Sequence, residues 1–117
     1  MAVRRGEIRS YLPGVSGREK ASALSGDRAL VISNDGANRS MQTALVLPVR
    51  ERIDADLPPS AFSLIVPLGD LDPVPGGAVL TYWPQVIPMA WFTESVGMVS
   101  QATMRQVFAA MVDYIGE

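Results

Sequence analysis

The sequence predicts a mainly β protein of the α+β class: a small, strongly curved antiparallel barrel with one helix at its C-terminus. Short runs of apolar and β-branched residues, bounded by Gly, Pro, Asn or Asp, recur along most of the chain and are typical of short strands joined by turns. Only the last stretch carries apolar residues at helical spacing. A barrel of short strands closed by a C-terminal helix satisfies both patterns.

Length and composition predict a single domain spanning residues 1–117. The 117 residues are 48% hydrophobic, which is enough for one modest core and too little chain for two. No apolar run approaches the roughly 20 residues of a membrane span, and no charged-then-apolar leader opens the chain. The chain has no cysteine, so nothing indicates an oxidising compartment. We therefore expect a soluble, cytoplasmic protein that does not contact a membrane.

Two buried strands are expected near the middle of the chain. Residues 30–32 are an apolar, β-branched run, and the polar turn Asn34-Asp35-Gly36 ends it. Residues 43–49 form a second apolar run. The turn therefore joins two core strands.

The remaining strands are expected on both sides of this pair. Residues 7–12 alternate polar and apolar side chains, as in a strand with one buried face. Residues 13–27 are rich in Gly, Ser and charge and predict a long loop, of the kind that is usually functional or disordered. Further strands are expected at residues 61–68 and 78–83, followed by 83–88, an edge or bulged strand because of its two prolines.

The C-terminal helix has the clearest pattern. Ser100 is a good N-cap, and the apolar residues that follow it are spaced to form one stripe. The members of the stripe are Met104, Val107, Phe108, Met111, Val112 and Ile115. We expect this stripe to pack on the barrel.

The residue types that are absent narrow the chemistry. The chain contains no His and no Cys, which excludes the usual zinc sites, a cysteine nucleophile and imidazole acid–base catalysis. We therefore expect no metal and no cofactor. All ten Lys and Arg residues except Arg105 lie before residue 53, although the net charge is −2. Such a basic half is compatible with an anionic ligand, and equally with a solvated surface.

Three short motifs occur in a recognisable order. They are Arg5-Gly6-Glu7-Ile8, then Ala29-Leu30-Val31-Ile32-Ser33-Asn34-Asp35 with Asn38-Arg39, and last Gly97-Met98-Val99-Ser100-Gln101-Ala102-Thr103-Met104. The ordered set resembles the MazF/PemK family of toxin ribonucleases from bacterial toxin–antitoxin pairs. It spans nearly the whole chain.

The resemblance implies an SH3-like barrel that forms a two-fold homodimer, with a groove that binds single-stranded RNA or the extended tail of a cognate antitoxin. Members of the family cleave RNA without metal. The loop segment around Arg18, Glu19 and Lys20 looks like the family segment that borders the groove, so these residues are expected to bind RNA together with Asn34 and Gln85. Residues 83–92, with Met89 and Trp91, are expected to form part of the dimer interface or to close the core of the subunit.

The two catalytic positions depart from the family pattern. The residues credited in the family are an Arg before the second strand, which falls on Asp27, and a Thr ending the next strand, which falls on Arg50. Arg28 and Arg50 are the expected catalytic residues, on one basic groove, if the chain is an endoribonuclease. Two alternatives stay open: a CcdB-like relative that inhibits a protein target such as DNA gyrase, or a degenerate member that only binds antitoxin.

Overall fold

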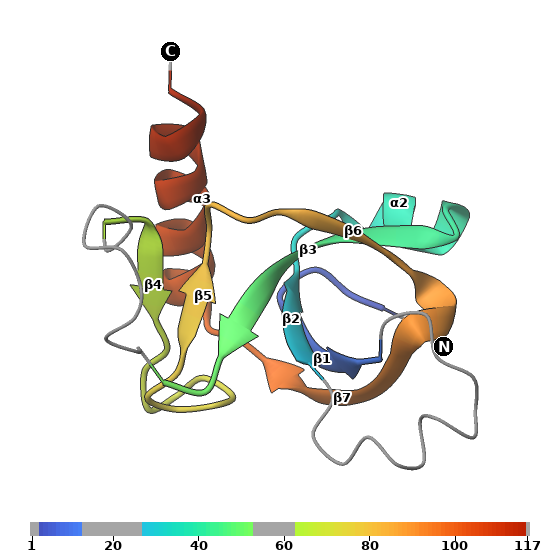
Figure 1. Ribbon diagram of the computed structural model, residues 1–117, viewed down its shortest axis with the longest axis horizontal. Helices are drawn as coiled ribbons and strands as arrows, with labels where there is room; N and C mark the ends of the chain where they lie inside the picture. Colours follow the sequence, from blue (N-terminus) through green and yellow to red (C-terminus); the bar gives the residue numbers. More distant parts are fainter. Residues whose placement is uncertain (1–2, 13–26, 53–62, 117) are drawn as a thin grey trace.

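The computed structural model describes residues 3–12, 27–52 and 63–116. They form an antiparallel seven-stranded sheet with a C-terminal helix against it, which confirms the predicted fold class (Figure 1). The strand order is β4-β5-β3-β2-β1-β7, and β6 pairs with β3 outside this path. The elements are β1 (Glu7–Tyr11), β2 (Asp27–Val31), α2 (Asp35–Ser40), β3 (Thr43–Arg50), β4 (Ile65–Pro67), β5 (Ala78–Leu80), β6 (Gln85–Pro88), the 3-10 helix η2 (Met89–Trp91), β7 (Phe92–Met98) and α3 (Gln101–Ile115).

The two faces of the sheet carry separate apolar clusters. Leu30 and Leu47 are cross-strand partners and belong to the cluster that packs against Val107 of α3. Val31 and Val46, one residue along each strand, belong to a second cluster on the opposite face. Because side chains alternate along a strand, the near-continuous apolar runs of β2 and β3 serve both clusters.

The polar turn after β2 contains a helix that the sequence analysis did not predict. Asn34 is the N-cap of α2, and its Oδ1 accepts a hydrogen bond from the N–H of Ala37 at 2.8 Å. Asn38 is buried, and its amide exchanges hydrogen bonds with the hydroxyl and carbonyl of Ser33. Asn and Asp favour turns and helix N-caps for the same reason, since their side chains bond nearby backbone N–H groups.

The expectation that β1 has only one buried face is wrong. Glu7 and Arg9 are 7% and 6% exposed, although they alternate with the apolar residues of the strand. Both side chains lie on the face of the second apolar cluster, since Arg9 is the cross-strand partner of Ala29 in that cluster. On its other edge, β1 pairs with β7. The sequence analysis missed β7 because Thr93, Glu94, Ser95 and Gly97 interrupt any apolar alternation.

The three strands after β3 are shorter than predicted. Of the expected strand 61–68, residues 61–62 lie outside the described part and β4 begins only at Ile65. β5 ends at Leu80, and the chain turns before Gln85 begins β6. Among the strands that the structure describes, β6 pairs only with β3, which confirms the edge strand expected from its prolines.

Helix α3 begins where the sequence indicates. The Ser100 hydroxyl accepts a hydrogen bond from the N–H of Thr103, and Val107 is fully buried. The last turns differ from the expectation, because Val112 and Ile115 are 67% and 76% exposed. The C-terminal end of α3 extends past the sheet, so the final part of the stripe packs on none of the described strands (Figure 1). In the described part of the chain, no helix is long and apolar enough to cross a membrane.

Candidate catalytic positions and nucleic-acid interface

The expected catalytic arginines lie where β2 begins and β3 ends, on opposite faces of the sheet. Arg28 pairs with Val49, so the next residue, Arg50, points to the other face. Arg50 lies four residues after Val46 on β3, and Gln85 is the cross-strand partner of Val46. The register therefore brings Arg50 and Gln85 to one face of the sheet and leaves Arg28 on the other.

Arg28 forms an ion pair with Glu51, the residue that follows Arg50 in the chain. Its Nη1 lies 3.5 Å from Oε1 of Glu51, with one third of the Arg28 side chain and three quarters of the Glu51 side chain exposed. A pair this exposed adds little to stability. It does place a carboxylate beside the Arg28 guanidinium, and this carboxylate would repel a phosphate.

The end of β3 is held by a close backbone approach. Arg50 pairs with Ala78 of β5, and a Cβ added to the neighbouring Gly77 would lie 2.5 Å from the Arg50 carbonyl oxygen. The N–H of Gly77 donates to the carbonyl of Val74, which has a positive φ of 57°. Only glycine fits between this turn and the Arg50 backbone.

The expected RNA-binding residues have different surroundings. Asn34 is exposed, with its Oδ1 committed to the cap of α2, and Gln85 is half-buried at the start of β6. The loop residues Arg18, Glu19 and Lys20 lie outside the described part of the chain, and so does the side chain of Asp27. The register brings none of the described candidates to Arg28.

Residues 83–92 divide between core and surface. Ile87 and Phe92 are buried in the second cluster, and Met89 and Trp91 pack against it. Trp83 and Val86 are 51% and 63% exposed. The segment thus closes the core of the subunit and also presents apolar side chains to the surface.

A buried ion pair that the sequence analysis did not single out lies under β7. Nη1 of Arg9 is 2.9 Å from Oε2 of Glu7, and the guanidinium lies over the Phe92 ring. Burial raises the pKa of Glu7, but hydrogen bonds from Ser95, Arg9 and the Arg4 N–H outweigh it and leave the pKa below its usual value. Glu7 is therefore a structural anion and not a proton acceptor at neutral pH.

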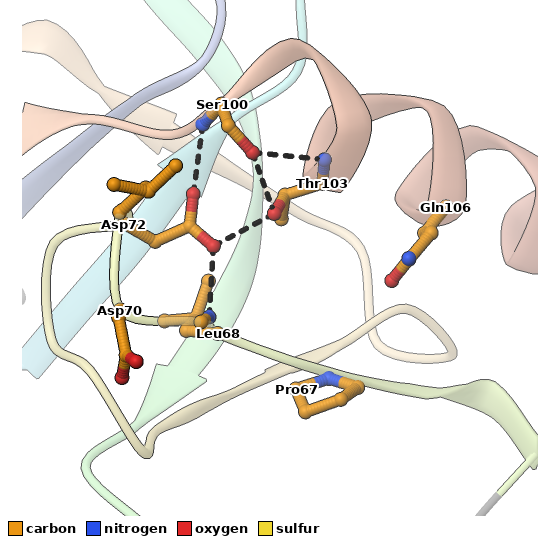
Figure 2. Close-up of a pocket in the computed structure, with 9 residues that line it drawn as sticks. Pro67, Leu68, Asp70, Asp72, Ser100, Thr103 and Gln106 are labelled. Carbon is orange, nitrogen blue, oxygen red and sulfur yellow. Dashed lines mark hydrogen bonds between the residues drawn. The ribbon is translucent and has the colours of Figure 1, made fainter.

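A second buried carboxylate joins the β4–β5 connection to α3. Asp72 accepts hydrogen bonds from the N–H of Ser100 at 2.8 Å, from the hydroxyl of Thr103 at 2.7 Å and from the N–H of Gly69 at 2.9 Å. Figure 2 shows Asp72 facing Ser100 and Thr103 at the start of α3. Burial raises the pKa of Asp72, while these hydrogen bonds lower it by more. This network gives a structural reason for the Ser and Thr of the last sequence motif.

A pocket of about 330 Å³ lies beside this network (Figure 2). Its lining residues are Pro67, Leu68, Gly69, Asp70, Leu71, Asp72, Ser100, Thr103 and Gln106. Both oxygens of Asp72 are occupied by donors of the protein itself, so Asp72 is not available as a base for a ligand here. In the part of the chain that the structure describes, no three His, Cys, Asp or Glu residues are placed to hold a metal ion.

The sequence matches no protein-family model and no curated protein. Solved structures do match. An endoribonuclease from a mycobacterial species superposes with a TM-score of 0.77 at 18% identity, over 99% of this chain and 93% of that one. A mycobacterial endoribonuclease in complex with its cognate antitoxin gives 0.77 at 19% identity, over 98% and 96% of the two chains.

A third match is MazF in a MazE–MazF complex from Deinococcus radiodurans, with a TM-score of 0.73 at 17% identity, over 99% of this chain and 97% of that one. The resemblance noted in the sequence motifs thus extends to the arrangement of the whole chain. The protein therefore has the fold of the MazF toxins.

Proposed function

We propose that this protein is the toxin of a toxin–antitoxin pair and a metal-independent endoribonuclease that cuts single-stranded RNA at specific sequences. The observation that carries the proposal is the match in fold, over nearly the full length of both chains, to endoribonucleases and to a MazF–MazE complex. The ordered sequence motifs support the same function independently. We also propose a homodimer and a cognate antitoxin as partners.

In the proposed chemistry the ribose 2′-oxygen attacks the adjacent phosphorus while its proton passes to water, and the bond from phosphorus to the 5′-oxygen breaks. The 5′-oxygen takes up a proton from water, so the products are a 2′,3′-cyclic phosphate and a 5′-hydroxyl, and arginine stabilises the charge of the transition state. Arg50 is the leading candidate, because it occupies the position of the family's Thr and shares a face with Gln85. A guanidinium donates two parallel hydrogen bonds to phosphate oxygens, which a Thr hydroxyl cannot do. Bound in this way, Arg50 would neutralise the charge that grows on the phosphate oxygens.

Arg28 is proposed as a second phosphate ligand, reached around the end of the sheet. It points to the opposite face from Arg50, but its guanidinium extends to Glu51, the residue next to Arg50. Binding of a phosphate near Arg50 would compete with Glu51 for Arg28. The loop residues Arg18, Glu19 and Lys20, with Asn34, are proposed to contact the bases and flanking phosphates.

The departure at both family catalytic positions favours a second candidate, a MazF-like protein that does not cleave RNA. Asp27 and Arg50 stand where the family has Arg and Thr. Such a protein would act on a protein target, as CcdB-like toxins do on DNA gyrase, or would only bind antitoxin.

One experiment separates the candidates. The purified protein is incubated with a long single-stranded RNA in excess chelator, and the cleavage products are mapped by primer extension. Cuts at a few short sequences, lost in Arg50→Ala, support the ribonuclease. Intact RNA together with arrest of growth on expression would reject the ribonuclease in favour of a protein target.

A further inference from the structure

Exposed arginines gather at the end of β2 opposite to the candidate catalytic positions. Arg5 is anchored there by two backbone contacts: its own N–H donates to Oδ1 of Asp35 at 2.7 Å, and the N–H of the next residue, Gly6, donates to the carbonyl of Val31. Arg4 precedes it and is also exposed. Arg5 and Gly6 are thereby held against α2 and β2.

The Arg5 guanidinium is held in one orientation. Its Nε donates to the carbonyl oxygen of Ile32 at 2.9 Å, and its Cζ lies 5.2 Å from the centre of the Phe108 ring on α3. The two terminal nitrogens make no hydrogen bond to any residue that the structure describes. A fixed guanidinium with its terminal fork free binds the paired oxygens of a phosphate with little further loss of side-chain freedom.

Two more arginines extend this surface on either side of Arg5. Arg39 lies four residues after Asp35 on α2, and Arg105 lies three residues before Phe108 on α3, so each neighbours a residue that contacts Arg5. Both are exposed. Within the described residues, neither they nor Arg4 and Arg5 form an ion pair. We call Arg4, Arg5, Arg39 and Arg105 the arginine surface.

We propose that the arginine surface binds phosphates of the RNA strand that flank the cleaved bond. The proposal rests on the proposed ribonuclease function. Ile32, which holds Arg5, lies four residues after Arg28, or about 13 Å along a strand that rises about 3.3 Å per residue. The residues between them, 29–31, are fully buried, so an RNA strand would pass around the sheet and 13 Å is the shortest separation. A stacked strand advances about 3.4 Å per nucleotide, so the phosphates concerned lie at least about four nucleotides from the cleaved one. An RNA strand carries one negative charge per nucleotide, so its successive phosphates can each contact a different arginine of this surface.

The test uses RNA in which every 2′-hydroxyl is methylated, which removes the nucleophile and prevents cleavage. Binding of a fluorescent strand of mixed sequence, about 16 nucleotides long, is measured by anisotropy at several NaCl concentrations. Arg4→Gln and Arg39→Gln should each reduce the slope of log affinity against log salt by about 0.7, the value for one phosphate contact on a single strand. The matched control Arg39→Lys should keep the slope, because the charge remains.

Arg5→Lys tests the held guanidinium itself. It keeps the charge but loses the fork and the contact to Ile32, so binding should weaken several-fold with little change in slope. A strand of about four nucleotides, which is too short to reach both sites, should bind the parent protein much more weakly than the long strand does. A melting temperature equal to that of the parent protein excludes unfolding as the cause of weaker binding in each variant.

The proposal fails if Arg4→Gln and Arg39→Gln leave the salt slope of the long strand unchanged. It also fails if the variants lose binding only to a fluorescent glutamate-rich peptide, since the arginine surface would then serve an acidic protein partner. Failure of the proposed function gives a different result: the parent protein leaves unmodified RNA uncut, whatever the salt slopes are. Cleavage with unchanged slopes would reject the arginine surface alone.

Discussion

The carboxylate of Asp72 and the hydroxyl of Thr103 are joined by a 2.7 Å hydrogen bond that ties the β4–β5 connection to the first turn of α3. The same carboxylate accepts the N–H of Ser100, the N-cap of this helix. Asp72 lies 31 residues before Thr103 in the chain, so the bond fixes α3 against the sheet through a contact that is distant in sequence.

We expect Asp72→Asn to lower the free energy of unfolding by about 1–3 kcal/mol, because an amide nitrogen would face donors that the carboxylate now satisfies. Urea denaturation followed by circular dichroism measures the change. Asp70→Asn is the matched control, since Asp70 is exposed in the same connection and its loss should shift the stability by less than about 0.5 kcal/mol. Equal effects of the two variants would contradict the role given to Asp72.

The lowered pKa values of Asp72 and Glu7 predict how stability depends on pH. Each carboxylate has a folded-state pKa below its unfolded value of about 3.9 or 4.3, so its contribution is present above the unfolded pKa. That contribution is lost as the pH falls through the folded pKa. Urea titrations from about pH 7 to about pH 2 should show stability falling below about pH 4.5, and less steeply in Asp72→Asn. An equally steep fall in the variant would show that Asp72 is not responsible.

The buried Glu7–Arg9 pair should respond to single and double substitution in opposite ways. Glu7→Leu or Arg9→Met alone leaves one charge buried without its partner, and breaking such a pair typically costs about 3–5 kcal/mol. Glu7→Leu combined with Arg9→Met removes both charges and should recover most of that loss. A double-mutant cycle by chemical denaturation measures the coupling. Additive losses would mean that the pair is not coupled.

Arg50→Ala and Arg28→Ala should each abolish toxicity on expression. Loss of one donor to a charged transition state typically reduces the rate by about 10²–10³, or about 2.7–4 kcal/mol. Cleavage of a fluorescent RNA measures the rate, and the thermal melt should stay nearly unchanged because neither side chain is buried. Asp27→Ala, which removes an anion from the family's arginine position, should preserve or improve RNA binding. If Arg50→Ala and Arg28→Ala remained toxic while Asp27→Ala lost activity, the catalytic site would not be at these two arginines.

Gly77→Ala should disturb the candidate site without touching a charged residue. Its Cβ would lie 2.5 Å from the Arg50 carbonyl oxygen, so either β3 or the turn must shift, and activity and stability should both fall. Gly36→Ala in α2 is the control: its Cβ would meet only the Asn34 Oδ1 at 3.4 Å, and Ala favours a helix over Gly by about 0.5–1 kcal/mol. Differential scanning calorimetry measures the stability of both variants, and the cleavage assay measures their activity. A Gly77→Ala protein that matches the parent in both would show that the end of β3 is not constrained there.

Local patterns in the sequence determined the class of the fold and its clearest elements. Ser100 marks the start of α3 because a hydroxyl at an N-cap satisfies a free backbone N–H, a bond made within one turn of the chain. The apolar runs of β2 and β3 are evident because both faces of these strands are buried. The ordered motifs indicated the MazF-like arrangement before any comparison of structures, since they come from elements along the whole chain.

Pairing between distant segments decided the rest. The alternation of Glu7 and Arg9 with apolar residues indicates a solvated face, but in the fold this face meets the second apolar cluster. β7 has no apolar alternation because its place comes from backbone hydrogen bonds to β1. The facing of Arg28 and Arg50 depends on the β2–β3 register, in which a shift of one residue exchanges the two faces. The apolar stripe of α3 is buried only as far as the sheet extends. The helical spacing of Val112 and Ile115 gives no information about where the sheet ends. Side-chain spacing is a local property of the chain, whereas register, strand pairing and the edge of a sheet exist only once distant segments have met.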